Sequence, residues 1–587
     1  MTAPVLLRRP RPARWTSGLA VGGGFTTVLG VLLVTGFVAV GLHAGPVSWS
    51  TLLTSSTWYP SGGLFGVTAM VWGTCAVCAV ALVLAVPVCW SAAVALAEYL
   101  PPRAAGPLRS GVELLAAVPS IVYGLVGIAA VRPAVAWLGN VPGGDSLLAA
   151  GVVLAVMVLP TIVAVSVDAL RAVPLDVREA ATSLGLTRSE VVRAAVLPLA
   201  RPGMRAAVLL GLARALGETI AVFLVIGRAD GRLPAPRHLL DALFQPGQTL
   251  TTKLGGPEPV LAGAVGPHRA ALCAVALLLL LVVAGATVLG ASRPTVAAAS
   301  RARMVRAGRA RELRCLAHRT LGTLAVLLPL ALLAAIAGLL LVRGSAGLAP
   351  SFWTTASTGA SGGGVSGQIL GTALLVVASG LLSLPVGVGL GLVLGEWASP
   401  RWVRAARTAT LTLGGVPTIL LGLAGFAVFG TALGWGKSWL AGALVLSVVV
   451  VPVVALATAA RLDQLPAATR EAALALGLTR HQLVRSVLLT WIRPAVLTGT
   501  LLGLARAAGE TAPLLFTATV FAGATALPRG IVQAPVEALP SHIFALAQDA
   551  ADPASIDAAW GAALVLVVLA GLLLLLALPL RRRLEPR

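Results

Sequence analysis

The stretch REAATSLGLTRSEVVRAAVLP, residues 178–198, returns in altered form as REAALALGLTRHQLVRSVLLT, residues 470–490. Glu-Ala-Ala favours a short helix, and the glycine four residues further on permits a turn that other residues resist. Thr187-x-x-Glu190 then has the pattern of a capping box, which begins another helix, and Thr-x-x-Gln takes its place in the second copy. The stretch therefore predicts a helix, a turn and a second helix, made twice in one chain.

The repetition extends beyond this stretch on both sides. Arg214 and Glu218 recur as Arg506 and Glu510 at the same spacing of 292 residues. Three upstream residues, Pro87, Glu98 and Pro119, recur at a spacing of 298 residues as Pro385, Glu396 and Pro417. The chain is therefore a duplicated sequence in which one small change of length separates two matched blocks.

The composition indicates that both copies lie in a membrane. Hydrophobic residues make up 58% of the chain and charged residues 11%, against about 25% charged residues in a typical soluble domain. Apolar runs long enough to cross about 30 Å of hydrocarbon predict twelve spans, at 19–42, 66–96, 112–138, 147–167, 203–227, 270–291, 320–342, 367–395, 408–434, 440–460, 495–521 and 559–580. We predict an all-α, multi-pass membrane protein.

The positive charges indicate how these spans are oriented. The net charge of +22 lies in short arginine clusters between apolar runs, which is typical of membrane topology and not of a nucleic-acid-binding face. With twelve spans, these clusters fall on one side of the bilayer, and the positive-inside rule makes that side cytoplasmic. We therefore expect both termini and the arginine-rich segment 292–319 in the cytoplasm, and no nucleic acid as a partner.

The duplication and the spans together predict the domain organisation. The first repeat occupies 1–291, the cytoplasmic linker 292–319 and the second repeat 320–587. Each repeat has an even number of spans, so both have the same orientation. The two six-span repeats are expected to be parallel and related by an axis along the membrane normal.

The duplicated loop resembles the signature loop of ABC importer permeases, in which Glu-Ala-Ala-x-x-x-Gly is followed by an apolar-x-Leu-Pro group. That resemblance implies that the loop docks on a cytoplasmic ABC ATPase dimer, which binds ATP and Mg²⁺ itself. It implies no cofactor, catalytic residue or enzymatic activity in this chain. The residues assigned to docking are Glu179, Ala180, Ala181 and Gly185 in the first copy and Glu471, Ala472, Ala473 and Gly477 in the second.

A second pair of motifs resembles the phosphate importer permeases. LARALGET at 212–219 is similar to the PstC type and LARAAGETAPLLFTA at 504–518 to the PstA type. VPSIVYG at 118–124 and VPTILLG at 416–422 support this resemblance. It implies a fusion of two permease subunits with the type I ABC importer fold, in the plasma membrane of a bacterium. It also implies inorganic phosphate as the substrate and an extracytoplasmic phosphate-binding protein as a partner.

The arginines of these motifs fit an anion path. Arg214 and Arg506 lie about eleven residues into their predicted spans, roughly 16 Å at the helical rise and so near mid-bilayer. An arginine there costs about 2.5–3.5 kcal/mol and is expected to face the protein interior or water. Glu218 and Glu510, four residues further along the chain, would lie on the same helical face as Arg214 and Arg506. The alternative interpretation makes both arginine–glutamate pairs purely structural.

Other functions stay open at this point. The substrate can be another oxyanion, such as sulfate, molybdate or tungstate, and the chain can be a secondary transporter or a phosphate sensor.

The five scattered cysteines predict no metal site. Gly387, Gly391 and Gly395 form a small-xxx-small pattern that predicts close helix packing.

Overall fold

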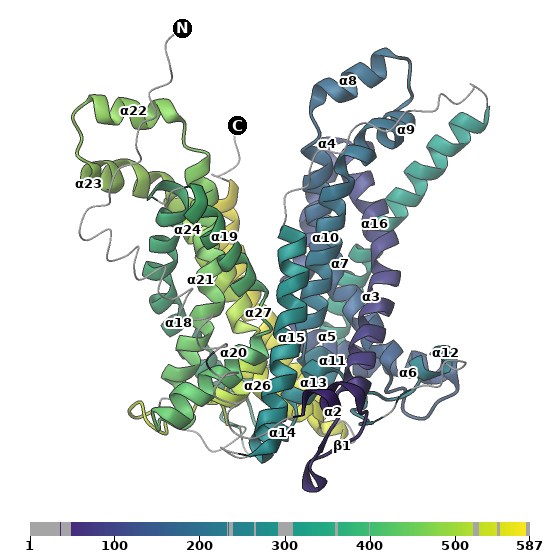
Figure 1. Ribbon diagram of the computed structural model, residues 1–587, viewed down its shortest axis with the longest axis vertical. Helices are drawn as coiled ribbons and strands as arrows, with labels where there is room; N and C mark the ends of the chain where they lie inside the picture. The colour runs from purple at the N-terminus through teal and green to yellow at the C-terminus, as the bar shows by residue number, and fades with distance from the viewer. Residues whose placement is uncertain are drawn as a thin grey trace. The chain divides into compact units, whose positions relative to one another are not determined.

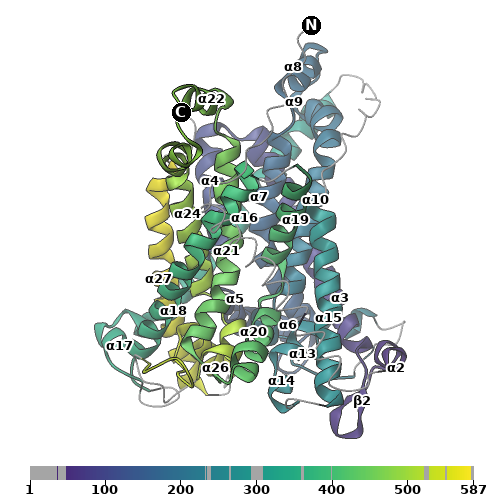
Figure 2. The ribbon, with the colours of Figure 1, turned by 60° about the vertical axis from the view of Figure 1, so that its left-hand side comes forward.

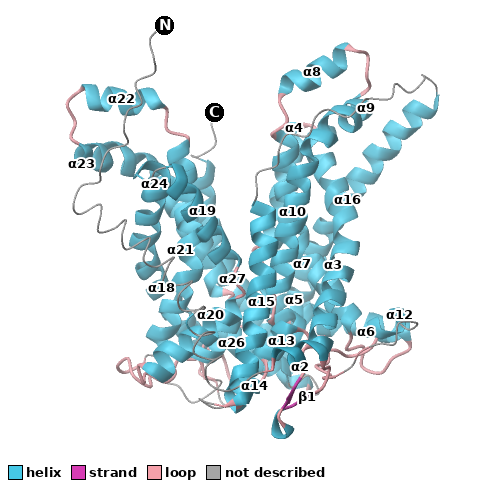
Figure 3. Ribbon diagram, viewed as in Figure 1, coloured by secondary structure: helices cyan, strands magenta, loops and turns pink. Residues whose placement is uncertain are grey.

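A computed structural model describes residues 36, 48–231, 233, 239–262, 266–291, 309–357, 362–397, 400–520, 528–548 and 552–582. Within these ranges the chain is helical apart from one short pair of strands and its connecting loops (Figure 3). It divides into two compact units, of which one is Gly41–Ser345 and the other includes Ala346–Arg587. The predicted all-α class is confirmed.

The N-terminal unit packs its long helices side by side, with short elements at both ends (Figure 1). It begins with α2 (Trp49–Thr54) and the antiparallel strands β1 (Trp58–Tyr59) and β2 (Leu64–Phe65), which are joined by the 3₁₀ turn η1 (Pro60–Gly62). Then follow α3 (Thr68–Val94), η2 (Ala95–Tyr99), α4 (Pro102–Leu115), α5 (Ser120–Val126), η3 (Gly127–Val131), α6 (Arg132–Gly139), α7 (Leu147–Arg171), α8 (Leu175–Ser183), α9 (Arg188–Val191), η4 (Val192–Val196) and α10 (Leu197–Gly217). The unit continues with α11 (Ile220–Phe223), α12 (Leu239–Leu243), α13 (Leu250–Gly255), α14 (Glu258–Leu261), α15 (Pro267–Ala291) and α16 (Arg309–Arg343).

The described part of the C-terminal unit repeats the order of the long helices, without a counterpart of β1 and β2. After the turn η6 (Ser345–Leu348), it contains α17 (Pro350–Thr354), α18 (Ser366–Leu392), η7 (Val393–Trp397), α19 (Pro400–Gly415), α20 (Thr418–Gly425), η8 (Phe426–Ala432), α21 (Trp439–Asp463), α22 (Ala467–Ala475), α23 (Arg480–Gln482), η9 (Leu483–Leu488), α24 (Leu489–Ala508), α25 (Ala512–Thr517), α26 (Leu539–Gln548) and α27 (Pro553–Arg582). The elements η2, η3, η4, η7, η8 and η9 are π-helical turns, so each unit carries three in the same places.

The number of spans agrees with the apolar runs. Ten helices of the described chain are long and apolar enough to cross a membrane, and the bent pair Ala405–Gly415 and Thr418–Ala432 makes an eleventh if it counts as one span. These correspond to eleven of the twelve predicted spans. The remaining prediction, 19–42, lies outside the described residues except for Gly36.

The two predicted third spans begin too early. In the C-terminal unit the two helices on either side of Pro417 are bent by 89°. In the N-terminal unit α4 ends at Leu115 and a new helix starts at Ser120, directly after Pro119. Proline disfavours helical backbone in the residue before it but fits the start of a helix. Each apolar run is therefore divided at its proline.

The two predicted fifth spans, 203–227 and 495–521, are also corrected. The structure has continuous helices over Arg188–Gly217 and Leu483–Ala508, and both then break. Glycine is a poor helix former, and after it Glu218 adopts extended backbone with φ −76° and ψ 128°. The arginines therefore lie in the last turn of a helix and not in the middle of a continuous span.

The last long helix of the N-terminal unit comes from the second sequence repeat. α16 packs against α3 and α4, and a Cβ at Gly322 would lie only 2.9 Å from the Cβ of Ala95. The predicted boundaries between the two repeats and the linker stay a prediction about the sequence. The two compact units of the structure divide after Ser345. Residues 309–319 of the predicted linker are helical, as the start of α16.

The predicted glycine pattern packs helices closely. A side chain at Gly387, Gly391 or Gly395 would overlap Val454, Thr458 or Leu462 of α21. Successive glycines on α18 and η7 thus face successive turns of α21. The small-xxx-small prediction is confirmed.

Candidate functional site: two surface loops and two helix breaks

The repeated loop forms the predicted helix, turn and helix in each unit. α8 and α9 surround a turn at Gly185, where φ is +76°, and α22 and α23 surround a turn at Gly477, where φ is +78°. L-residues with a side chain rarely adopt this backbone, which explains why the turn needs glycine. α8 and α22 lie beyond the ends of the long helices of their own units (Figure 2).

The predicted capping boxes cap the N-terminus of the second helix in each loop. The Thr187 backbone N–H donates to Glu190 Oε2 at 2.9 Å. The Thr479 N–H donates to Gln482 Oε1 at 2.8 Å, and the Gln482 N–H donates in return to Thr479 Oγ1 at 3.4 Å. Both capping boxes are confirmed, and each fixes the direction in which the chain leaves the turn.

The loops expose part of the predicted docking motif and bury the rest. The exposed members are Glu179, Ala180 and Gly185 with Glu471, Ala472 and Gly477. Ala181 and Ala473 are only 7% and 6% exposed, so they pack beneath the surface. Leu184 and Leu476, directly before the glycines, are 82% and 81% exposed. Sequence reasoning missed these leucines, although their matched positions beside the turn were visible.

At the first helix break, Arg214 lies in the last turn of α10. Its Nη1 donates to Thr161 Oγ1 of α7 at 2.9 Å. Glu218 follows as the cap of the helix, in extended backbone. The predicted shared helical face therefore ends before Glu218.

The second break has its arginine beside the predicted glutamate. Arg506 Nε lies 3.5 Å from Glu510 Oε1, and the two side chains are 48% and 16% exposed. Val453 stands where the first copy has Thr161, so α21 offers no hydroxyl to this arginine at that position. Arg506 is thus paired with the predicted glutamate and is accessible at the same time.

Each break also buries a threonine hydroxyl. Thr219 and Thr511, directly after the glutamates, are 3% and 1% exposed. Among the described residues, neither Oγ1 has a hydrogen-bond partner. A buried unpaired hydroxyl costs free energy, so two at matched positions need a reason other than stability.

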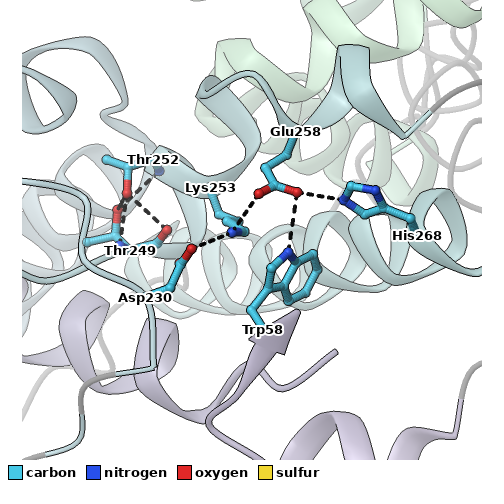
Figure 4. Close-up of polar contacts among 7 residues, drawn as sticks. All are labelled: Trp58, Asp230, Thr249, Thr252, Lys253, Glu258 and His268. Atoms are coloured by element: carbon cyan, nitrogen blue, oxygen red, sulfur yellow. Dashed lines mark hydrogen bonds and ion pairs between the residues drawn. The ribbon is translucent and has the colours of Figure 1, made fainter. Parts of the chain in front are cut away.

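The opposite end of the N-terminal unit from α8 contains a cluster of charges around a buried lysine (Figure 1 and Figure 4). Lys253 is 1% exposed, and its Nζ lies 2.9 Å from Asp230 Oδ2 and 3.0 Å from Glu258 Oε1. Glu258 Oε2 also accepts from Trp58 Nε1 at 3.3 Å and lies 2.6 Å from His268 Nε2. Burial raises the pKa of Glu258. The hydrogen bond and charge of Lys253, together with the hydrogen bonds to His268 and Trp58, lower it by more, so the pKa lies below its ordinary value. The cluster fixes β1 and α14 to α13 and α15.

The duplicated loops and broken helices define a class of membrane transport proteins. The chain belongs to the family of binding-protein-dependent transport system inner membrane components, which matches residues 85–296 and 387–587. The two matches confirm that the duplication consists of two copies of one permease domain.

The N-terminal half is similar to named members of this family. It is 38% identical over 296 residues to the phosphate transport system permease protein PstC 2 of Mycobacterium tuberculosis, covering 45% of this chain and 90% of that protein. It is 33% identical over 278 residues to the PstC protein of Mesorhizobium japonicum, covering 43% of this chain and 82% of that protein. It is 36% identical over 236 residues to the probable ABC transporter permease protein YqgH of Bacillus subtilis, covering 40% and 72%.

Proposed function

We propose that this chain, as a fusion of two permease subunits, is the transmembrane permease of an ATP-driven importer for inorganic phosphate. The observation that carries the proposal is the similarity of the N-terminal half to PstC phosphate permeases, along 90% of the length of one of them. The second family match supplies the other half of the permease within the same chain. A bacterial plasma membrane is the corresponding location.

The repeated loops are the proposed docking sites for a separate ABC ATPase dimer. Each offers a glutamate, an alanine and an exposed leucine on a turn whose shape depends on glycine. Leu184 and Leu476 are apolar side chains that an ATPase cleft would cover. In this proposal ATP and Mg²⁺ bind to the ATPase, and this chain hydrolyses nothing.

The helix breaks are the proposed substrate path. Guanidinium groups bind phosphate oxygens through two parallel hydrogen bonds. Arg506 is 48% exposed, and its Nε lies 3.5 Å from Glu510 Oε1. A carboxylate also accepts a hydrogen bond from protonated phosphate but not from sulfate, which carries no proton at neutral pH. Arg506 and Glu510 would therefore favour phosphate, which an extracytoplasmic binding protein delivers.

Uptake of labelled phosphate into vesicles that contain this chain, its ATPase and its binding protein tests the substrate. We expect ATP-dependent phosphate uptake that excess sulfate, molybdate or tungstate does not reduce. ATP-dependent uptake of one of those anions instead would contradict phosphate as the substrate. Uptake that persists without ATPase subunits would contradict the ATP-driven mechanism.

Substitution of Arg506 tests the path. We expect Arg506→Gln to lower uptake per transporter at least about ten-fold, the effect of losing one hydrogen bond to a charged group. Arg493→Gln, an exposed arginine of the same helix, is the matched control and should leave uptake unchanged. Normal uptake in Arg506→Gln would refute the path role, as would a loss of membrane protein equal to the loss of uptake.

A further inference from the structure

A glutamate at the end of one long helix forms an ion pair with the arginine directly before the proposed docking residues. Arg178 Nη2 lies 2.8 Å from Oε1 of Glu98 in η2, the π-helical turn that continues α3. The same guanidinium donates to the carbonyl oxygens of Leu170 and Val173, each at 2.7 Å. Arg178 therefore joins α8 to the ends of two long helices, α3 and α7.

The C-terminal unit contains the same arrangement. Arg470 Nη2 lies 3.0 Å from Oε2 of Glu396 in η7, and it donates to the carbonyl oxygen of Leu462 at 3.1 Å. Leu462 occupies the position in α21 that Leu170 occupies in α7. The arginine–glutamate pair and the contact with the leucine carbonyl oxygen are thus present in both units, although the surrounding sequences differ.

Burial distinguishes these pairs from the ion pairs beside them. The side chains of Glu98 and Glu396 are 9% and 17% exposed. Asp168 and Asp463, which pair with Arg109 and Arg407 in the same regions, are 64% and 51% exposed. Exposed pairs contribute little, whereas removing one partner of a buried pair leaves a charge without compensation.

The local backbone also marks this position. Glu98 and Glu396 both lie in π-helical turns, which are rare and are frequently found at functional sites. The carbonyl oxygens that Arg178 and Arg470 bind are at helix C-termini, where a positive charge is favourable. Each arginine thus joins its own short helix to two long helices, by contacts that each gain from charge.

We infer that the Glu98–Arg178 and Glu396–Arg470 pairs are the links that carry movement of the docking loop to the membrane-spanning helices. This inference rests on the proposed function, since an ATPase must move α8 and α22. When the ATPase dimer closes, each arginine pulls the end of α3 or α18 together with α7 or α21. The four residues act as positioning residues and do not touch the substrate.

Hydrogen exchange in the complex with the ATPase that co-purifies with the chain tests this link without any transported substrate. Trapping the ATPase with ADP and vanadate should change exchange in α8 and in residues 95–99 of the wild-type chain. In Glu98→Gln we expect the change in α8 to remain and the change at 95–99 to disappear. Asp168→Asn, which removes the neighbouring exposed pair, is the matched control and should behave as wild type.

The same variants are then measured for transport. Glu98→Gln should lower phosphate uptake per transporter at least about ten-fold, while the amount of bound ATPase stays normal. If Glu98→Gln does not accumulate as folded protein, Glu396→Gln in the more exposed copy gives the same comparison, with η7 in place of η2. The link is overturned if the change in hydrogen exchange persists in the η2 or η7 turn of the variant. It is also overturned if no such change occurs there in the wild type. Absence of phosphate uptake in the wild type contradicts the proposed substrate and leaves the exchange result to decide the link.

Discussion

Single residues at the helix breaks show how far the two copies have diverged. Arg214 donates to Thr161 of α7 and is half-buried, whereas Arg506 has a valine at that position of α21 and is exposed. A change from Thr161 in one copy to valine in the other accounts for part of this difference. Duplicated charges therefore do not have equal surroundings, and we expect the two arginines to contribute unequally to transport.

The buried threonine hydroxyls give a prediction at this scale. Replacing Thr219 or Thr511 with valine keeps the shape and removes a buried hydroxyl that has no partner in the described chain. We expect each variant to gain stability, up to about 1–3 kcal/mol, and to lose uptake, since a polar group retained at a cost in stability indicates functional use. Thermal unfolding in detergent and uptake per transporter measure the two effects. A Tm below wild type in both variants would contradict this account.

At the scale of elements, the proposed docking loop depends on one backbone angle in each copy. Gly185 and Gly477 have φ near +76° and +78°, and nothing lies within 4 Å of the position that a Cβ would take. Substitution there is therefore opposed by backbone strain and not by steric overlap with a neighbour. The strain acts on the turn between α8 and α9, or between α22 and α23, which presents the exposed leucine.

We therefore predict that Gly477→Val distorts the loop without unfolding the membrane part. The left-handed backbone costs about 1–2 kcal/mol for a residue with a side chain, so the turn should rearrange and uptake and ATPase co-purification should fall. Gly571→Val, at a helical glycine that also has open space around it, is the matched control. The Gly185→Val and Gly477→Val double variant must stay in the membrane at normal abundance. Normal ATPase stimulation and uptake in it would contradict the assignment of these loops to docking.

At the scale of the whole molecule, the compact units and the sequence repeats do not coincide. α16 starts within the predicted linker and continues into the second repeat, yet it packs against α3 and α4 of the N-terminal unit. Gly322 permits the close approach to Ala95. The fused chain thus keeps α16 next to helices from which it is separated by about two hundred residues.

Disulfide formation in a divided chain checks the placement of α16. The chain is cut between residues 300 and 301, both parts are co-expressed without native cysteines, and Ala95→Cys is combined with Gly322→Cys. The short distance between the two Cβ positions predicts that oxidation joins the parts into one band of full-length mass. Ala95→Cys with Gly338→Cys is the control, because nothing lies within 4 Å of a Cβ at Gly338. No cross-link in the first pair, or equal cross-linking in both, would show that α16 packs elsewhere.

The orientation of the whole chain is predicted by its arginines and is tested by labelling. In a cysteine-free background, a thiol reagent that cannot cross membranes should label Tyr59→Cys in intact cells, since Tyr59 is 57% exposed on the predicted outer side. It should label Val305→Cys only after the cells are opened, because position 305 lies in the arginine-rich segment. Labelling of position 305 in intact cells would show that the predicted orientation is wrong.

The sequence by itself determined the class, the duplication, the approximate positions of most described spans and the shape of the repeated loop. These properties depend on composition over some twenty residues, or on rules that act within one turn, such as the positive φ at Gly185 and the Thr187–Glu190 capping box. The tertiary structure decided where the fifth spans break, which motif alanines are buried, and that α16 joins the N-terminal unit. It also brought Glu98 to Arg178, although 80 residues separate them. Such contacts join residues far apart in the chain, so they depend on how the helices pack, and no local pattern specifies that packing.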